Sequence, residues 1–342
     1  MVKSALLAVA LTALTLSPAA QAKPTPIALA IHGGAGTIDP DNMSEAQREA
    51  VTAKLDQALM AGYALLEQGK PALDAVEAAV RVLEDSPLFN AGVGAVYTWD
   101  ERHELDASIM DGATLEAGAV AGVTTVRNPI SLARRVMTDS AHVMLSGQGA
   151  EQFAQSQGLE QVANSHFDTE RRLQSLHKAK AKIQAQEAVS HQAAVATLDD
   201  HYKMGTVGAV ALDRNGNLAA ATSTGGMTAK RWGRIGDSPV IGAGTYADND
   251  SCAVSATGHG EFFIRYNVAA DICARAKYQG IPLAEASDTV INQRLVAAGG
   301  TGGVITVDPQ GRVAMPFNTQ GMYRASIDAE GNKMVAIWGT SQ

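Results

Sequence analysis

The sequence contains very little cysteine, the residue on which domains stabilised by disulfides or by structural metal ions depend. Its 342 residues include only two cysteines, Cys252 and Cys273. Two cysteines in a chain of this length exclude a disulfide framework, and neither has a histidine or a further cysteine at metal-ligand spacing. In an oxidising compartment the two could pair, and the sequence leaves that pairing open.

Positive charge and aromatic side chains are also scarce. The formal net charge is -8 and there is no basic stripe, so a nucleic-acid partner is not expected. Aromatic residues make up 5% of the chain, whereas it has 33 glycines. This composition suits tight turns and strands that pack closely through small side chains, and the length suffices for one large α/β domain.

Beyond its first residues the chain lacks long apolar runs. The N-terminus carries Lys3, an apolar run over residues 5–16 and the small-x-small sequence Ala20-Gln21-Ala22. These are the three parts of a secretory signal, with cleavage expected after Ala22. The alternative interpretation is a membrane anchor, for which the run is short. We therefore expect an exported protein without a membrane segment, most simply in a bacterial periplasm.

The pattern of the remaining chain predicts alternating strands and helices. A short apolar run at residues 26–31 precedes HGGAG, which we expect to be a glycine-rich turn. Helices are expected at 44–68, opened by a capping box, and at 71–83. Further strands are expected at 117–126, 252–257, 303–307, 312–318 and 334–338, and further helices within 127–157 and at 261–278 and 281–298. Such runs of strands and helices indicate a layered α/β sandwich.

Composition changes sharply near Gly158. Residues 159–204 are rich in Gln, Lys, Glu, His and Ala and contain few large apolar side chains. We expect an exposed, flexible linker with some helical tendency that adds little to a core. It ends at the bond between Gly205 and Thr206, which would then be accessible.

That bond opens the stretch around which the chain is organised. Residues 206–212 and 218–224 are β-rich runs on either side of an Asn-Gly turn, which predicts an antiparallel hairpin. A cut between Gly205 and Thr206 would give Thr206 a hydroxyl and a free α-amine, whose ordinary pKa of about 8 suits a general base. The alternative is an ordinary Gly-Thr pair at the start of a strand.

Several motifs occur in an order that resembles one family. They are HGGAG at 32–36, LEDSPLFNAGVGAVYT at 83–98, ELDASIMDG at 104–112, GTVGAVALD at 205–213, ATSTGG at 221–226, GRIGDSP at 233–239 and SATGHGE at 255–261. Together they resemble the plant-type asparaginases, also called isoaspartyl peptidases, which are N-terminal nucleophile hydrolases. The likeness runs from about Ile27 to the C-terminus, apart from the linker.

The resemblance implies a four-layer αββα sandwich that is made as an inactive precursor. The precursor would cleave itself between Gly205 and Thr206. The products would be an α subunit of residues 23–205, ending in the 159–204 linker, and a β subunit of residues 206–342. Both would form one globular domain, and two αβ units would form a dimer.

The resemblance also assigns roles to individual residues. Thr206 would be the nucleophile, Thr224 would hydrogen-bond its oxygen, and Thr257 with Gly258 would form the oxyanion hole. Asn90 would donate near the scissile bond. The structural alternatives are a plain strand threonine at position 224 and an Asx-turn cap at Asn90.

A second group of residues would hold the substrate. Arg234 and Asp237 stand three residues apart in a glycine-flanked loop. A guanidinium suits an α-carboxylate and a carboxylate suits an α-amine, so the pair would bind the head of an aspartyl group, and Gly258 and Gly260 would complete the pocket. The alternative is a surface salt bridge between the two side chains.

No cofactor is expected, but the family has a loop that binds sodium through main-chain carbonyls, the hard ligands that suit such an ion. The residues that match it are Leu83, Glu84, Ser86, Phe89, Ala91 and Val93.

These assignments lead to an isoaspartyl dipeptidase with L-asparaginase activity, acting on β-aspartyl dipeptides and asparagine. One alternative is glycosylasparaginase, in which an acidic residue typically precedes the threonine where Gly205 stands here. Another, from a different class, is a periplasmic protein that binds amino acids without turnover.

Overall fold

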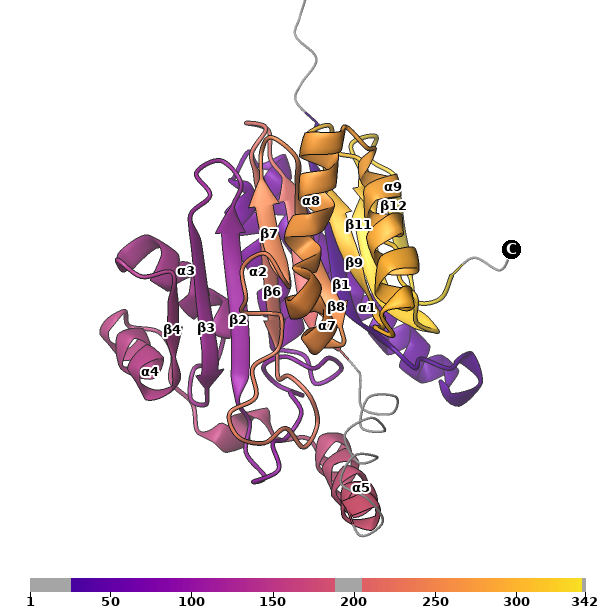
Figure 1. The fold of residues 1–342 in the computed structure, drawn as a ribbon. Helices are drawn as coiled ribbons and strands as arrows, with labels where there is room; N and C mark the ends of the chain where they lie inside the picture. Colours follow the sequence, from indigo (N-terminus) through magenta and orange to yellow (C-terminus); the bar gives the residue numbers. More distant parts are fainter. Residues whose placement is uncertain (1–25, 188–204, 340–342) are drawn as a thin grey trace, which may run out of the picture.

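A computed structural model describes residues 26–187 and 205–339 of the chain (Figure 1). The expected signal sequence and residues 188–204 of the expected linker lie outside this part. Within it, no helix is both long and apolar enough to cross a bilayer.

The described residues form two stacked sheets with helices on both outer faces, as expected from the sequence. The large sheet has the strand order β12-β11-β1-β5-β6-β2-β3-β4, and the small sheet has the order β10-β9-β8-β7. The strands are β1 (Ala28–Gly36), β2 (Leu105–Asp111), β3 (Ala117–Val123), β4 (Met144–Ser146), β5 (Val207–Leu212), β6 (Leu218–Thr224), β7 (Thr245–Asp248), β8 (Cys252–Gly258), β9 (Gly302–Val307), β10 (Val313–Ala314), β11 (Gly321–Ile327) and β12 (Lys333–Ala336).

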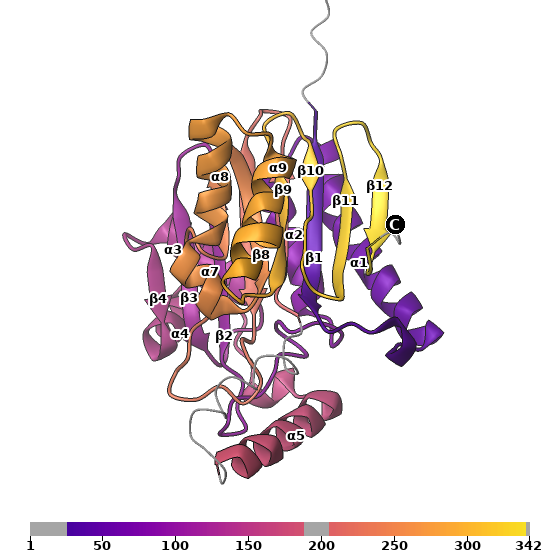
Figure 2. The same ribbon diagram turned by 45° about the vertical axis from the view of Figure 1, so that its right-hand side comes forward.

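Helices α1, α2 and α3 cover the large sheet, whereas α8 and α9 cover the small one (Figures 1 and 2). The α-helices are α1 (Glu45–Glu67), α2 (Ala72–Glu84), α3 (Pro129–Asp139), α4 (Gly147–Ser156), α5 (Glu170–Glu187), α7 (Gly260–Tyr266), α8 (Val268–Gln279) and α9 (Leu283–Asp288). Short 3-10 helices lie at η1 (Pro40–Asn42) and η2 (Asn164–Phe167), and η3 (Thr289–Leu295) is a π-helix.

Small side chains fill the space between the two sheets. On β1, Leu29 and Ile31 face the α1 and α2 layer, whereas Ala28 and Ala30 face the other sheet. Alternation of this kind is expected of a strand buried on both faces. A larger side chain at Ala30 would overpack this layer at a cost of about 1–3 kcal/mol.

Most expected elements are present, and the differences have local causes. Ser44 caps α1 in a complete capping box. The HGGAG segment is not a turn, because β1 continues through it to Gly36 with a bulge between His32 and Gly34. The helix expected at 261–278 breaks at Asn267, whose φ of 50° is left-handed.

Part of the expected linker, residues 164–187, contains the helices η2 and α5, and its buried side chains correct the expectation that the linker adds little to a core. Helix α5 lies across one end of the sandwich (Figures 1 and 2), and Leu176, Ala179 and Ile183 are buried against Tyr97 and Ala229. The stretch has few apolar residues, but these three stand at helical spacing and form one buried stripe.

The two cysteines form a disulfide. It joins Cys252 on β8 to Cys273 on α8, with the two Cα atoms 5.4 Å apart. The bridge therefore fastens a helix of the outer layer to a central strand of the small sheet.

Candidate active site

The hairpin of β5 and β6 brings the two candidate threonines together. Thr206 directly precedes β5 and Thr224 ends β6, and their hydroxyl oxygens lie 3.1 Å apart. The backbone N–H of Gly226 donates to the Thr224 oxygen at 3.0 Å, which fixes that hydroxyl. Both threonines line a pocket together with Asn90, Arg234, Asp237, Thr257 and Gly258.

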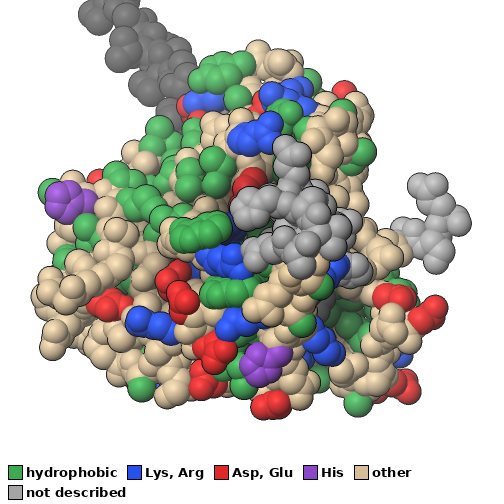
Figure 3. Space-filling model, turned by 60° about the horizontal axis from the view of Figure 1, so that its bottom comes forward, with side chains coloured by type: hydrophobic (Ala, Val, Ile, Leu, Met, Phe, Trp, Pro, Cys, Tyr) green, Lys and Arg blue, Asp and Glu red, His purple; other side chains and the backbone are tan. Residues whose placement is uncertain are grey.

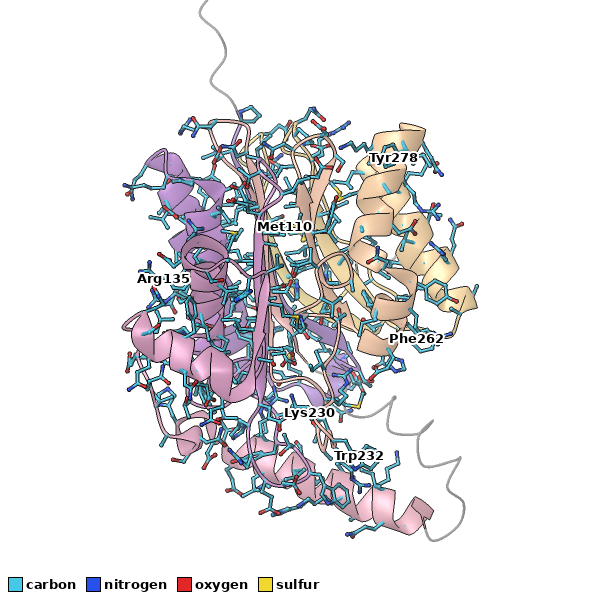
Figure 4. The ribbon with its side chains drawn as sticks, turned by 60° about the vertical axis from the view of Figure 1, so that its left-hand side comes forward. Met110, Arg135, Lys230, Trp232, Phe262 and Tyr278 are labelled. Carbon is cyan, nitrogen blue, oxygen red and sulfur yellow. A yellow bond between two sulfur atoms is a disulfide. The ribbon has the colours of Figure 1, made fainter. Side chains whose placement is uncertain are left out.

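The pocket lies at the end of the sandwich where β5 begins and where β6 and β8 finish. Lys230 and Trp232, from the loop after β6, lie at this end (Figure 4). The face of the molecule there carries basic side chains among acidic and hydrophobic ones (Figure 3). Trp232 is 94% exposed, whereas Lys230 is buried and donates to the carbonyl of Glu104 at 2.9 Å.

Gly205 adopts a backbone conformation that favours glycine. Its φ is 108°, and an added Cβ would stand 3.0 Å from the nitrogen of Asn90. Gly34 packs still closer, because a Cβ there would lie 2.1 Å from the Cα of Gly205. A side chain at either position would displace the Gly205–Thr206 peptide.

The Gly205 carbonyl is hydrogen-bonded by the backbone of Asn90, with the donor nitrogen 3.0 Å from the carbonyl oxygen. The Asn90 side chain makes separate hydrogen bonds. Its Nδ2 donates to the Gly226 carbonyl at 2.8 Å and its Oδ1 accepts from the Val96 N–H at 2.9 Å. The side chain thus fixes the loop, and the N–H faces the carbonyl of the Gly205–Thr206 bond.

The expected oxyanion-hole residues end β8 beside the pocket. The Thr257 hydroxyl oxygen accepts the Ala35 N–H at 3.2 Å, which leaves the hydroxyl proton available for donation. Gly258 follows at the pocket wall. A Cβ on Gly258 would lie 2.4 Å from the Thr301 carbonyl, so only glycine fits there.

Arg234 and Asp237 both reach the pocket, but they do not form a salt bridge with each other. Arg234 instead binds Glu261 bidentately, through Nε at 2.9 Å and Nη2 at 3.0 Å. Burial, the largest single effect, acts to raise the pKa of Glu261, but the hydrogen bonds and the positive charge of Arg234, together with smaller contributions from the Glu261 backbone and His259, make the net shift downward. Sequence reasoning missed this partner, although Glu261 ends the SATGHGE motif.

Asp237 is buried with an open acceptor. Its Oδ2 has no hydrogen-bond partner among the described residues. Burial raises its pKa to about 7, although the nearby Arg234 opposes the shift. Gly260 lies against both groups, since a Cβ there would be 2.9 Å from Asp237 Oδ1 and from Arg234 Nη2. A cationic group of a ligand could supply the missing partner of this buried carboxylate.

The loop that carries Asn90 is held from below by the start of α5. Arg172 Nε donates to the Gly94 carbonyl at 2.7 Å, and Arg171 Nη2 donates to the carbonyls of Pro87 and Leu88. Neither arginine forms an ion pair with a described carboxylate. Burial lowers the pKa of Arg172 to about 9, with a further contribution from Arg171, so the guanidinium remains charged at neutral pH.

The six residues that match the sodium loop lie at the end of α2 and in the loop behind Asn90. The carbonyl of Glu84 accepts the Val93 N–H at 2.7 Å, and that of Leu83 accepts the Ser86 N–H at 3.2 Å. The other carbonyls of the set accept no hydrogen bond from the described residues; they belong to Ser86, Phe89, Ala91 and Val93.

The side chain of Glu84 is fully buried and bound by neutral donors. Its Oε1 accepts from the Ser223 hydroxyl at 2.6 Å and from the Ile130 N–H at 3.0 Å. Burial raises its pKa to about 8, against these hydrogen bonds. It thereby ties α2 and α3 to β6, next to Thr224.

Comparison with known proteins agrees with this geometry. The model of the asparaginase family matches residues 25–337. The isoaspartyl peptidase of Escherichia coli (strain K12) is 54% identical over 297 residues, covering 87% of this chain and 91% of the relative. The probable isoaspartyl peptidase/L-asparaginase 2 of Arabidopsis thaliana is 44% identical over 325 residues, covering 91% and 98%. The isoaspartyl peptidase/L-asparaginase of Homo sapiens is 44% identical over 286 residues, covering 84% and 88%. The chain thus belongs to the asparaginase family of hydrolases and has the layered α/β sandwich expected of it.

Proposed function

We propose that this protein is an isoaspartyl dipeptidase with L-asparaginase activity, activated by cleavage of its own chain between Gly205 and Thr206. The observation that carries the proposal is the position of the Thr206 hydroxyl, 3.1 Å from that of Thr224 and in one pocket with Arg234 and Asp237. The relatives with this name are 42–54% identical to the chain.

Activation would begin with attack of the Thr206 oxygen on the Gly205 carbonyl carbon. The carbonyl oxygen would become negative while the Asn90 N–H donates to it, at the 3.0 Å seen in the intact chain. The hydroxyl proton would pass to the threonine nitrogen as the C–N bond breaks, which moves the acyl group to the threonine oxygen and frees the amine. Water would then hydrolyse the ester, leaving a Gly205 carboxylate and the hydroxyl of Thr206.

Substrate hydrolysis would use the same oxygen. The new α-amine of Thr206 takes the hydroxyl proton, and the oxygen attacks the side-chain carbonyl of the aspartyl group. Thr257 and Gly258 would stabilise the oxyanion, and the protonated amine would give its proton to the departing amino acid or ammonia. Water then cleaves the β-aspartyl ester and restores the hydroxyl.

Recognition would rest on the free ends of two charged side chains. The open Oδ2 of Asp237 suits the α-ammonium of the aspartyl group. Arg234 keeps Nη1 clear of its pair with Glu261, and that nitrogen suits the α-carboxylate. Because only the α-ammonium and the α-carboxylate of the aspartyl group would be bound, dipeptides and asparagine could share the pocket.

A sodium ion would have a structural role only. The carbonyls of Ser86, Phe89, Ala91 and Val93 are open to it, and a Cβ at Gly94 would meet the carbonyls of Pro87 and Phe89 within 2.9 Å. These hard oxygen donors fit such an ion. Its binding would stiffen the loop that carries Asn90.

We also propose export to the periplasm after removal of residues 1–22, and assembly as a dimer of αβ units. The N-terminal segment has the parts of a signal sequence. The Cys252–Cys273 disulfide suits an oxidising compartment.

The test is denaturing electrophoresis and N-terminal sequencing of the purified protein, with assays on β-aspartyl-leucine, asparagine and glycosylated asparagine. We expect two fragments, one of which starts at Thr206, and turnover of the first two substrates. A Thr206→Ala variant should stay intact and inactive, whereas Thr206→Ser should still split. Preference for glycosylated asparagine would favour a glycosylasparaginase, and an uncut chain that depletes substrate only stoichiometrically would favour a binding protein.

A further inference from the structure

A fully buried histidine on β1 contacts the backbone of Thr206. His32 Nδ1 lies 3.0 Å from the carbonyl oxygen of Thr206, and Nε2 lies 3.0 Å from the hydroxyl of Ser255 on β8. The ring thus bridges the two sheets directly behind the candidate nucleophile. None of the roles assigned above uses it.

The hydrogen bonds decide which ring nitrogen carries the proton. A carbonyl can only accept, so Nδ1 donates to Thr206 and Nε2 accepts from the Ser255 hydroxyl. Burial lowers the pKa of His32 to about 3, although the hydrogen bond to Thr206 acts in the opposite direction. The ring is therefore neutral at working pH and holds one donor and one acceptor in fixed directions.

The neighbouring strand has a gap that makes this bridge possible. A Cβ on Gly208 of β5 would stand 2.0 Å from the Ser255 oxygen and 2.5 Å from His32 Nε2. Any side chain at Gly208 would separate the two groups. A glycine two residues after the candidate nucleophile is thus explained by the contact it leaves open.

The contact continues as a row of buried hydroxyls between the sheets. Ser255 lies 2.7 Å from Thr222, and Thr245 donates to Thr222. Ser108 lies 2.7 Å from Thr245 and donates to the Ser238 carbonyl at 2.6 Å. Ser238 is adjacent to Asp237, so the row runs from the nucleophile to the substrate-binding loop.

We propose that His32 is a positioning residue that fixes the Thr206 carbonyl and, through the hydroxyl row, sets it relative to the Asp237 loop. This inference rests on the proposed function. Thr206 becomes a chain end after cleavage, and chain ends fray unless they are tied down. Since the strand pairing of β5 begins at Val207, the histidine supplies the tie for the residue before it. The α-amine and the hydroxyl then project from a fixed peptide plane.

Two variants of similar polarity separate the two ring contacts. In His32→Asn the amide nitrogen can take the place of Nδ1 and donate to Thr206, whereas in His32→Gln the amide reaches the place of Nε2 and leaves the Thr206 carbonyl without a donor. We expect kcat of the mature His32→Gln enzyme to fall at least ~10-fold with KM nearly unchanged, since small misplacements of a reacting group are costly. His32→Asn should retain kcat within about 3-fold of the wild type.

A third variant keeps the test decisive if both histidine variants fold poorly. Ser255→Ala removes only the hydroxyl that orients the ring, and we expect a several-fold lower kcat. Its matched control is Ser287→Ala, which removes a buried hydroxyl bound to the Ala284 carbonyl on α9, far from the pocket. The control should lose thermal stability similarly and keep its kcat.

The outcomes also separate this inference from the proposed function. If the wild type turns over β-aspartyl substrates and His32→Gln matches it in kcat, the positioning role is excluded while the function stands. Equal losses in His32→Gln and His32→Asn, in proportion to their loss of Tm, would likewise reduce His32 to a structural residue. A wild type that splits but hydrolyses no β-aspartyl substrate would overturn the proposed function itself.

Discussion

The backbone N–H of Asn90 donates to the carbonyl oxygen of Gly205 across 3.0 Å. This carbonyl is the group that Thr206 would attack during activation. The side chain of Asn90 holds the N–H in place through Gly226 and Val96. We expect Asn90→Asp, which exchanges the donor to Gly226 for a repelling oxygen, to slow self-cleavage by about 10–100-fold. A time course of fragment appearance measures this, with Asn292→Asp on η3 as the control. An unchanged rate would mean that the N–H does not depend on the side chain.

The raised pKa of Asp237 predicts a pH dependence of ligand binding. Below about pH 7 the buried carboxyl is protonated and neutral, so it loses its attraction for an ammonium group. Inhibition by aspartate should therefore weaken as the pH falls through this range. Succinate has no ammonium, so its inhibition should be unchanged or stronger at the lower pH. Parallel inhibition profiles for the two compounds would show that Asp237 does not meet the ammonium.

The same shift predicts a gain in stability when the charge is removed. Because the folded-state pKa lies above the ordinary value, the contribution of this group to stability is lost as the pH rises through about 7. Asp237→Asn should thus raise the Tm by a few degrees at pH 8 and change it little at pH 5, while activity is lost. Thermal unfolding at both pH values tests this, and a variant that is less stable at pH 8 would contradict it.

The bidentate pair of Arg234 and Glu261 predicts a selective effect on substrate binding. In Glu261→Gln the negative charge that orients the Arg234 guanidinium is lost. The new amide NH2 also replaces one of the two acceptor oxygens, so a donor faces the guanidinium. We expect KM to rise about 10-fold with kcat changed less than about 3-fold, because the proposed role of the arginine is to bind the α-carboxylate of the substrate. The exposed Glu285→Gln on α9 is the matched control. A fall in kcat at constant KM would place Glu261 in another role.

The buried guanidinium of Arg172 predicts that stability and activation can be separated. Arg172→Met removes the hydrogen bond to the Gly94 carbonyl, but it also removes a buried charge that has no described counter-ion. These effects oppose each other in stability, so the Tm should change little while self-cleavage slows several-fold. Arg275→Met, which breaks a surface pair with Asp271 on α8, should leave cleavage unaffected. Unaltered cleavage in Arg172→Met would show that α5 does not position the loop.

The disulfide predicts a loss of stability on reduction. The bridge closes a loop with a sequence separation of 21 residues, and a cross-link of that span contributes about 3 kcal/mol. Reductant should therefore lower the Tm by several degrees. The double variant Cys252→Ala with Cys273→Ala should have the lower Tm already and show no response to reductant.

Elements with local signals could be predicted from the sequence. The capping box at Ser44 and the Asn-Gly turn before β6 specify their structures within a few residues. Strand β2 was not predicted, because polar residues occupy its buried positions. Ser108 donates to the Ser238 carbonyl, which lies far along the chain, and Asp106 Oδ1 accepts the Gly122 N–H from the next strand.

The sequence motifs predict which residues share the candidate site, but not how those residues pair. The motifs named Thr206, Thr224, Asn90, Arg234 and Asp237, and the structure brings all of them to one pocket. That Arg234 would bind Glu261 depends on how a loop meets a helix 27 residues later. The hydrogen bond from the Asn90 N–H likewise depends on the fold, because its acceptor, the Gly205 carbonyl, is distant in the sequence.

The order of strands in the large sheet has a consequence for the cleaved protein. Strand β1 precedes the cut, yet both of its neighbours, β5 and β11, follow it. The two proposed products would therefore be interleaved, and neither could leave without breaking the hydrogen bonds of β1 to both neighbouring strands. Cleavage would turn one polypeptide chain into two without separating the folded domain. A native gel should therefore show one species where a denaturing gel shows two.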